Sequence, residues 1–358
     1  MGRVCYCTRE AVMDAFDVKE SANRFAQVDA AIMGASDDVD AWLNRHKHGL
    51  APTLATRYFD WPRRDGGGAT RLWFDENELL EPTSIEAGGE TLAVDTDVFL
   101  EPVNSGPPYT YAEINLDSSG SFSNSGTHQR AVEIAGTWGV ADDSDAAGTL
   151  AAGVNASVTA WTVSDASLVG VGSVLRADDE RVLVTGRSAV TTGQTLTGDM
   201  DAFNADRSLE VADGTALHEG EIVTVGTERM KIISITGNAA TVERAVQGSV
   251  LASHTTGDTV YALRSLRVQR GALGTTPASH SLGATLTTWH VPDLVYQLVK
   301  ATAISTLEQE WSAYGQRVYS DEAERDSSGT DVISGRGLTD IRKQCARRYK
   351  RKFRKRAV

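Results

Sequence analysis

An internal repeat between about residues 150 and 290 constrains the fold of this chain more than any other feature of its sequence. One set of residues recurs after 26 positions without a gap: Val242, Arg244, Gly248, Ala252, Ser253, His254 and Gly257 match Val268, Arg270, Gly274, Ala278, Ser279, His280 and Gly283. A second set recurs after 48 positions: Val163, Asp165, Gly172, Glu180 and Arg181 match Val211, Asp213, Gly220, Glu228 and Arg229. The stretch is rich in Gly, Thr and Val and has almost no helical periodicity. It therefore predicts duplicated β-hairpin units with glycine-bearing turns, packed as a small barrel or sandwich.

The segment before this repeat also predicts short strands, because apolar runs alternate there with turn residues. The expected strands are Ala55–Phe59, Arg71–Phe74, Thr83–Ala87, Thr91–Val94, Val98–Glu101, Tyr109–Leu116 and Ala131–Trp138. Between this segment and the repeat, Asp142–Gly148 is acidic and made of small residues, and it is predicted to be an exposed linker.

Helical periodicity is confined to the two ends of the chain. Thr8 can cap a short helix over Arg9–Asp17, and a longer helix is expected from Ser21 to Arg45, where apolar residues recur every three or four positions. After Pro292, Asp293 can cap a helix that reaches Tyr314, and a last helix begins at about Leu338. For a single core to form, the N- and C-terminal helices should pack together.

These patterns predict an α+β fold with a helical core built from the N- and C-terminal helices, β-strand segments, and a large duplicated all-β insert. The predicted division is N-terminal helices in 1–52, a β-rich segment in 53–140, the duplicated β insert in 150–290, and C-terminal helices with a basic tail in 291–358. No apolar run approaches the roughly 20 residues that a membrane-spanning helix needs, so no membrane contact is expected.

The sequence contains no familiar catalytic or cofactor motif. A GxSxG nucleophile elbow, a GxxxxGK[ST] phosphate loop and an HExxH metal motif are all absent. Cys5 and Cys7 are separated by one residue and have no second cysteine pair nearby, which disfavours a zinc site. His254 and His280 each end a repeat and are expected to be hydrogen-bonded turn residues rather than metal ligands. We therefore predict no enzymatic activity, no catalytic residue, no cofactor and no metal.

The net charge of −13 combines two parts of opposite sign. Residues 342–358 carry ten Lys and Arg and no acid, so the 341 residues before them hold 25 basic and 48 acidic groups, a net charge of −23. Such segregation indicates a dedicated contact. The predicted contact residues are Arg342, Lys343, Arg347, Arg348, Tyr349, Lys350, Arg351, Lys352, Phe353, Arg354, Lys355 and Arg356. DNA phosphates and an acidic protein surface are both suitable partners for them, whereas a solvated helix end explains ten charges poorly.

Three segments, in their order along the chain, carry a family resemblance: Ala51–Pro62 directly after a helix, Phe99–Tyr109, and Arg130–Trp138. Together they resemble the head-to-tail adaptor (connector) proteins of long-tailed, siphovirus-type bacteriophages, notably those of actinobacterial hosts. The paired Arg-x3-Gly-[Ser/Thr]-x3-Ser-His-x2-Gly units resemble β modules inserted in such phage structural proteins. The helix Asp293–Tyr314 and the run Gly335–Leu338 also fit this resemblance.

The resemblance implies a structural virion protein at the head–tail interface, assembled in the host cytoplasm. Such adaptors form a homo-oligomeric ring, usually of twelve subunits, beneath the phage portal protein. The ring continues the channel for double-stranded DNA and offers its lower face to the next connector or tail component. In this chain the portal- or DNA-facing element would be the helix 338–358. The family pattern is mainly helical and much shorter, so the β insert has no counterpart in it.

Two other classes of function compete with this expectation. The first is a DNA-binding protein that uses the basic C-terminal helix, with the β part as its platform. The second is a carbohydrate-binding or glycan-cleaving virion protein that uses the β insert. The insert has only four large aromatics, Trp161, Phe203, Tyr261 and Trp289, which argues against a sugar-stacking platform.

Overall fold

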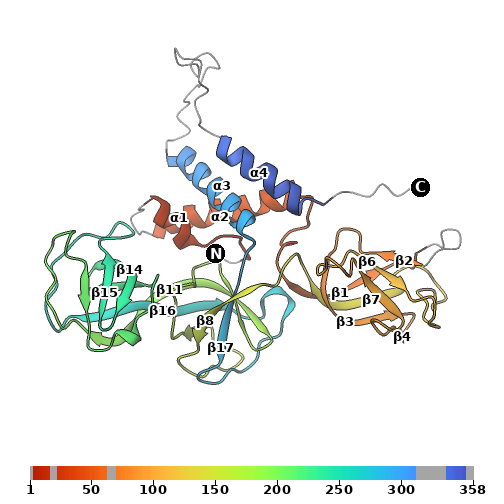
Figure 1. Ribbon diagram of the computed structural model, residues 1–358, viewed down its shortest axis with the longest axis horizontal. Helices are drawn as coiled ribbons and strands as arrows, with labels where there is room; N and C mark the ends of the chain where they lie inside the picture. The colour runs from red at the N-terminus through yellow and green to blue at the C-terminus, as the bar shows by residue number, and fades with distance from the viewer. Residues whose placement is uncertain (1–2, 17–21, 63–69, 312–335, 352–358) are drawn as a thin grey trace, which may run out of the picture. The chain divides into compact units, whose positions relative to one another are not determined.

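The computed structural model describes residues 3–16, 22–62, 70–311 and 336–351. The chain forms two compact units (Figure 1). The larger unit contains residues 1–39, 144–272 and 276–348, and the smaller unit contains residues 40–143, 273–275 and 349–358. Strands account for 36% of the chain and helices for 21%, with four α-helices among the described residues. The predicted fold class, a helical core carrying an all-β insert, is therefore wrong, because large antiparallel sheets dominate the molecule.

The smaller unit consists of two antiparallel sheets that share one core. The first sheet has the order β1-β7-β3-β4, formed by β1 (Thr53–Phe59), β7 (Val132–Trp138), β3 (Leu79–Ala87) and β4 (Glu90–Thr91). The second has the order β2-β6-β5, formed by β2 (Arg71–Trp73), β6 (Tyr111–Ile114) and β5 (Val98–Glu101). Buried side chains alternate along β7, and Phe59, Phe74 and Trp138 form an aromatic cluster between the two sheets.

The larger unit is built on a ten-stranded sheet. Its strand order is β12-β15-β14-β13-β16-β11-β10-β17-β8, with β9 paired to β16. The strands are β8 (Ser144–Thr149), β9 (Ala160–Thr162), β10 (Val174–Ala177), β11 (Glu180–Thr195), β12 (Ser208–Glu210), β13 (Ile222–Val225), β14 (Glu228–Thr236), β15 (Ala239–Glu243), β16 (Thr259–Gln269) and β17 (Thr285–Trp289). The segment 142–148 was predicted to be a linker, but most of it is the edge strand β8, because its backbone pairs with β17.

Two core clusters divide this sheet into two modules. The first module holds buried residues from 147–184 and 266–286, and the second holds buried residues from 196–262. The second module is thus inserted in the sequence of the first, and the long strands β11 and β16 run through both. Equivalent pairings recur in the two modules: Leu150 bridges Val163 as Leu196 bridges Val211, and Val154 bridges His280 as Met200 bridges His254.

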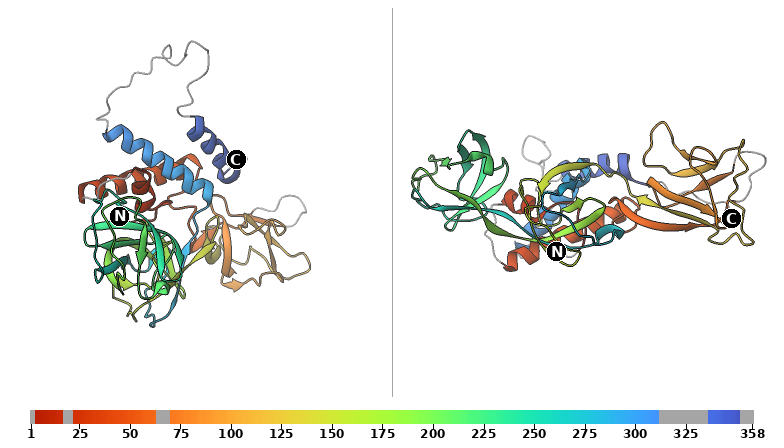
Figure 2. Two further views of the ribbon diagram at one scale, coloured as in Figure 1. Left: turned by 60° about the vertical axis from the view of Figure 1, so that its left-hand side comes forward. Right: turned by 90° about the horizontal axis from the view of Figure 1, so that it is seen from below.

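The helices α1 (Arg9–Phe16), α2 (Ala22–Trp42), α3 (Asp293–Trp311) and α4 (Arg336–Tyr349) form a separate layer. Figures 1 and 2 show α1, α3 and α4 gathered on one side of the ten-stranded sheet. Trp311 of α3 donates a hydrogen bond from Nε1 to Gln27 Oε1 of α2 at 3.2 Å, and its ring lies under the Arg24 guanidinium. The predicted apolar stripe of α2 is buried at Val28, Ile32, Ala35 and Val39.

The helical core was predicted because amphipathic helices show a clear stripe in the sequence. Alternating strands bury as much apolar surface per face, but in shorter and less conspicuous runs. Three of the buried clusters lie between or along the sheets, which is why β-structure defines the fold. None of the helices in the described part of the chain combines the length and apolar character that a membrane span requires.

Candidate partner interface

Helix α4 carries the exposed part of the basic segment that the sequence predicted to be a contact surface. At 3.6 residues per turn, Ile341, Cys345 and Tyr349 fall on one side of the helix, and these side chains are buried or half-buried. Lys343 and Arg347 lie one turn apart on the opposite side, whereas Arg342 lies at the border of the buried side, next to Tyr349. All three cations are exposed and have no ion pair or hydrogen bond among the residues that the structure describes. None of the described side chains neutralises these three charges.

The segment just after α4 is bound within the smaller unit. Arg45 donates from Nη2 to the Tyr349 carbonyl at 2.7 Å, and the Arg351 amide donates to the Leu43 carbonyl at 3.0 Å. The Arg351 side chain donates from Nη2 to Asn77 O at 2.8 Å and lies 3.5 Å from a Glu78 carboxylate oxygen. Burial is the main reason why the pKa of Arg351 is lowered, although Glu78 opposes that shift. Arg351 is thus a structural anchor.

The remaining predicted contact residues fall into two groups. Arg348 and Lys350 are exposed, and the Lys350 ammonium lies 5.5 Å from the centre of the Trp42 ring in a cation–π contact. Lys352, Phe353, Arg354, Lys355 and Arg356 lie outside the described residues. The structure therefore separates one predicted set into an unpaired face on α4, an anchored segment at 349–351, and a stretch that it does not describe.

The two modules each bury a Glu–Arg–His cluster. In the second module, Arg244 donates from Nε to Glu228 Oε1 at 2.7 Å and from Nη2 to Oε2 at 2.8 Å, and His254 Nε2 lies 2.9 Å from Oε2. In the first module, Arg270 pairs with Glu180 at 2.8 and 2.7 Å, and His280 Nε2 lies 2.9 Å from Glu180 Oε2. The Arg and His residues are those that recur after 26 positions in the sequence, and the Glu residues are those that recur after 48 positions.

The Glu carboxylates of these clusters are fully buried and fully bonded. Each also accepts two backbone amides, from Ala245 and Ala252 on Glu228 and from Gly271 and Ala278 on Glu180. Burial alone would raise the pKa of Glu180 and Glu228, but the bonds from arginine, backbone amides and histidine lower it to about 2 in both. A carboxylate held in this way is a structural anion rather than a proton donor or acceptor.

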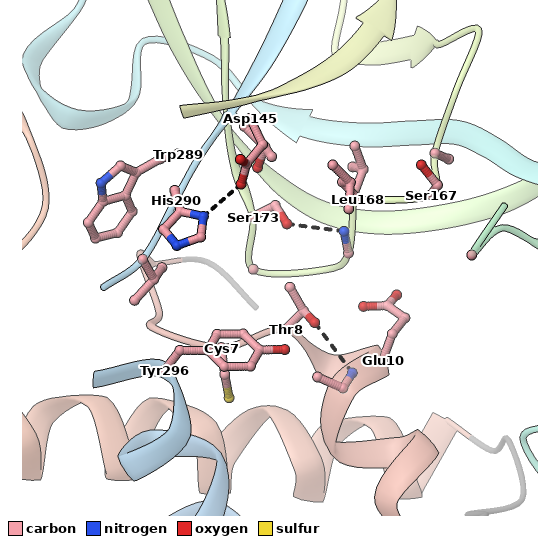
Figure 3. Close-up of a pocket in the computed structure, with 18 of the residues that line it drawn as sticks. Cys7, Thr8, Glu10, Asp145, Ser167, Leu168, Ser173, Trp289, His290 and Tyr296 are labelled. Atoms are coloured by element: carbon pink, nitrogen blue, oxygen red, sulfur yellow. Dashed lines mark hydrogen bonds and ion pairs between the residues drawn. The ribbon is translucent and has the colours of Figure 1, made fainter. Parts of the chain in front are cut away.

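A cavity of about 520 Å³ lies in the larger unit between the N-terminal segment, the loop 166–174 and the start of α3 (Figure 3). His290 is one of the titratable residues that line it, and its Nδ1 lies 2.7 Å from Asp145 Oδ2 while its Nε2 lies 3.3 Å from Asp293 Oδ1. The hydrogen bond with Asp145 is the main reason why the pKa of His290 is raised. Because both ring nitrogens face carboxylates, this imidazole is poorly suited to act as a general base.

The thiols and carboxylates around the same cavity are also engaged. Burial raises the pKa of Cys5 to about 12 and raises the pKa of Cys7 as well, so both thiols stay protonated and unreactive at neutral pH. Glu10 accepts the Val171 amide at 2.7 Å. Asp14 accepts hydrogen bonds from Lys231 and Gln247, both at 3.2 Å. Among the described residues, no group of three or more His, Cys, Asp or Glu side chains could hold a metal ion.

Comparisons of this chain with protein-family models, with curated proteins and with solved structures gave no match.

Sequence reasoning missed the partner of each repeated histidine. Glu180 and Glu228 were visible as a match at an offset of 48, and the Arg-and-His units as a match at an offset of 26. Each offset alone relates only part of a module. Because the second module is inserted into the first, the two offsets describe one duplication, and joining them would have identified both clusters.

Proposed function

We propose that this chain is a structural virion protein that forms a ring between the portal and the tail of a long-tailed bacteriophage. In this role it joins head to tail and continues the DNA channel, and it has no enzymatic activity. The proposal rests on the family resemblance of the three motif segments, and one observation of the structure supports it. Arg342, Lys343 and Arg347 are exposed on α4 and have no ion pair among the described residues, on a chain whose body is strongly acidic.

The buried charges support a scaffold role for the β part. The Glu228–Arg244 and Glu180–Arg270 pairs have their donors and acceptors satisfied inside the modules, and they fix several loops at once. Arg244, for example, also donates to the carbonyls of Asp201, Asp206 and Ala252. Polar networks of this kind specify one rigid arrangement. A ring subunit requires such rigidity, because errors in the angle between neighbours accumulate around a closed cycle.

The charge distribution suits a DNA conduit. A body with a net charge of −23 repels DNA and lets it slide, whereas a basic segment repeated around a ring forms a concentrated docking surface. Arg351 is anchored in the smaller unit, and the residues that follow it in the sequence are strongly basic. We assign the portal contact to this terminal stretch, 352–358.

The decisive experiment images the full chain alone and with its portal ring by electron microscopy. A deletion of residues 352–358 keeps the Tyr349–Arg351 anchor and tests docking without damaging the fold. We expect symmetric rings beneath the portal for the intact chain and a loss of portal binding of at least tenfold for the deletion. A chain that stays monomeric with portal, and forms no symmetric ring, would contradict the proposed function.

DNA binding by the basic helix is the second candidate, and the same exposed cations favour it. Its signature is a strong salt dependence, with affinity for a DNA duplex falling by orders of magnitude between about 50 and 200 mM salt. A salt titration with the intact chain, the 352–358 deletion and the portal ring separates the two. Salt-sensitive duplex binding without ring formation supports the DNA-binding protein, and portal docking without duplex binding supports the adaptor.

A further inference from the structure

Among the described residues of the smaller unit, no sheet or helix covers the outer face of the sheet β1-β7-β3-β4. Its inward residues form the core, so the alternate residues point away from it. The outward residues are Leu54, Thr56 and Tyr58 on β1, Glu133, Ala135 and Thr137 on β7, Glu81, Ser84 and Glu86 on β3, and Thr91 on β4. They are exposed or partly buried, and two of them, Leu54 and Tyr58, are large hydrophobic residues with 40% and 56% of their surface exposed.

This face carries acid and no base. Glu86 and Glu133 are direct partners in the register of β3 and β7, and Tyr58 is the partner of Glu133 on its other side. Like charges directly opposite each other destabilise an antiparallel pair. Glu81, Glu86 and Glu133 have no ion pair or side-chain hydrogen bond among the described residues. The arrangement is therefore complementary to a segment that brings several cations to a flat, partly apolar surface.

The chain itself contains such a segment in described structure. Lys343 and Arg347 lie on one side of α4 and are separated by one turn, about 6 Å along the helix. Their long side chains can reach carboxylates on neighbouring strands, whose side chains are spaced by about 5 Å across the pair. Their aliphatic stems can also cover exposed apolar residues such as Tyr58. The two cations on this side of α4 match the two neighbouring carboxylates, Glu86 and Glu133, on the sheet face.

We propose that the cationic face of α4 in one copy of the chain docks on the outer face of the β1-β7-β3-β4 sheet of a second copy. The two surfaces differ, so the contact is heterologous and repeats from copy to copy, as a ring requires. This inference rests on the self-assembly in the proposed function and names the surfaces that meet. The terminal stretch 352–358 then stays available for the portal.

Two matched charge reversals test the contact in the full-length chain. The helix variant is K343E/R347E, and the sheet variant is E86K/E133K, so each reverses two charges. The control, D117K/D179K, makes the same change in net charge as the sheet variant, at exposed residues that are not part of this sheet. Self-association is measured by sedimentation velocity at low salt, and folding by circular dichroism. We expect each reversal to weaken self-association by at least tenfold and the control to change it less than threefold.

Restoring self-association by combining the two variants shows that the loss in each single variant does not come from damage to the fold. Mixing the helix variant with the sheet variant recreates both kinds of complementary contact, so mixed assemblies should form at near wild-type strength. Combining both sets in one chain should also restore association. If the wild-type chain does not self-associate, if the sheet variant associates like the control, or if mixing restores nothing, the inference is overturned. Portal-bound rings that persist with the sheet variant would overturn this contact while leaving the proposed function intact.

Discussion

The two modules of the larger unit bury the same Glu–Arg–His cluster, but the residues around this cluster differ between them. Both hold a bidentate Arg–Glu pair with a histidine on the same carboxylate. In the first module, Trp161 closes the cluster, with its ring 5.1 Å from the Arg270 guanidinium and 5.6 Å from the His280 ring. The equivalent residue 48 positions later is Leu209, so the second module packs the same charges without an aromatic ring. The two modules therefore share the charge cluster and differ in the hydrophobic residue, Trp161 or Leu209, next to it.

A second difference concerns the far side of the histidine. His280 Nδ1 lies 2.8 Å from Asp178, which is 68% exposed, whereas the position equivalent to Asp178 is Gly226. A third ion pair, Arg264 with Glu221, has no copy in the first module, where the equivalent of Glu221 is Ser173. Glu221 also accepts the Ala166 amide at 3.3 Å, so this unduplicated pair ties the second module to the first. The two modules thus share one cluster, and an ion pair without a counterpart links them.

The largest effect is expected when the carboxylate is removed from a cluster. Glu228→Gln leaves Arg244, whose side chain is fully buried, without its counter-charge, and we expect a loss of about 3–5 kcal/mol in unfolding free energy. Glu180→Gln should cost slightly less, because Arg270 keeps its contact with Trp161. Urea denaturation measures both. The exposed Glu243→Gln is the control and should change stability by less than about 0.5 kcal/mol; equal losses in all three variants would refute the structural role of the clusters.

Acid should weaken both modules in the same pH window. The folded pKa of Glu180 and Glu228 is about 2, below the ordinary value of 4.5, so their contribution to stability is complete above pH 4.5 and is lost as the pH falls toward 2. Each cluster should lose on the order of 3 kcal/mol across this window. Unfolding free energies measured from neutral pH to pH 2 check this. In the Glu228→Gln variant, the loss of unfolding free energy between pH 4.5 and pH 2 should be roughly halved. An unchanged loss would contradict the low pKa of Glu228.

Exchanging the hydrophobic residues Trp161 and Leu209 tests how much the stability of each module depends on its own residue at this position. Trp161→Leu gives the first module the residue of the second, and we expect a loss of about 1–3 kcal/mol from the cavity and the lost cation–π contact. The reverse change, Leu209→Trp, forces a larger ring into a fully buried site and should cost about 1–3 kcal/mol by overpacking. Thermal unfolding with each variant measures the two costs. A stabilising Leu209→Trp would show that the second module has room for the ring that it lacks.

The smallest effect is expected at the exposed end of the first cluster. Asp178→Asn removes the second carboxylate from His280 and should cost less than about 1 kcal/mol, because solvent screens a side chain that is mostly exposed. Asparagine also tolerates the positive φ of 51° at this position. The same denaturation assay measures it. A loss above about 2 kcal/mol would show that Asp178 is part of the buried cluster rather than an accessory to it.

Much of the local structure could be predicted from the sequence. The expected strands at Val98–Glu101 and Ala131–Trp138 correspond closely to β5 and β7, because alternating apolar residues show which side of each strand is buried. The helices α1 and α3 begin at the expected residues, Arg9 and Asp293. The segment 142–148 was misread, because an edge strand of small and acidic residues has the composition of a linker and is defined only by its partner strand.

The candidate partner surface was only partly visible in the sequence. A run of ten cations indicates a contact, but composition cannot distinguish the free Arg347 from the anchored Arg351 four residues later. That distinction depends on Glu78 and Asn77, more than 270 residues away in the chain. The acidic sheet face was invisible for the same reason, since Glu86 and Glu133 become neighbours only through the register of β3 and β7.

By itself, the sequence determined the duplication, the helical ends, the alternating strands and the separation of an acidic body from a basic tail, because each is a local or periodic property of the chain. Tertiary structure decided which of these dominates the fold and which charges are free. The repeated Arg and His residues acquire their role only when β11 and β14 bring Glu180 and Glu228 beside them, 100 and 26 residues away from His280 and His254. Burial then makes an unpaired charge so costly that these distant residues must meet.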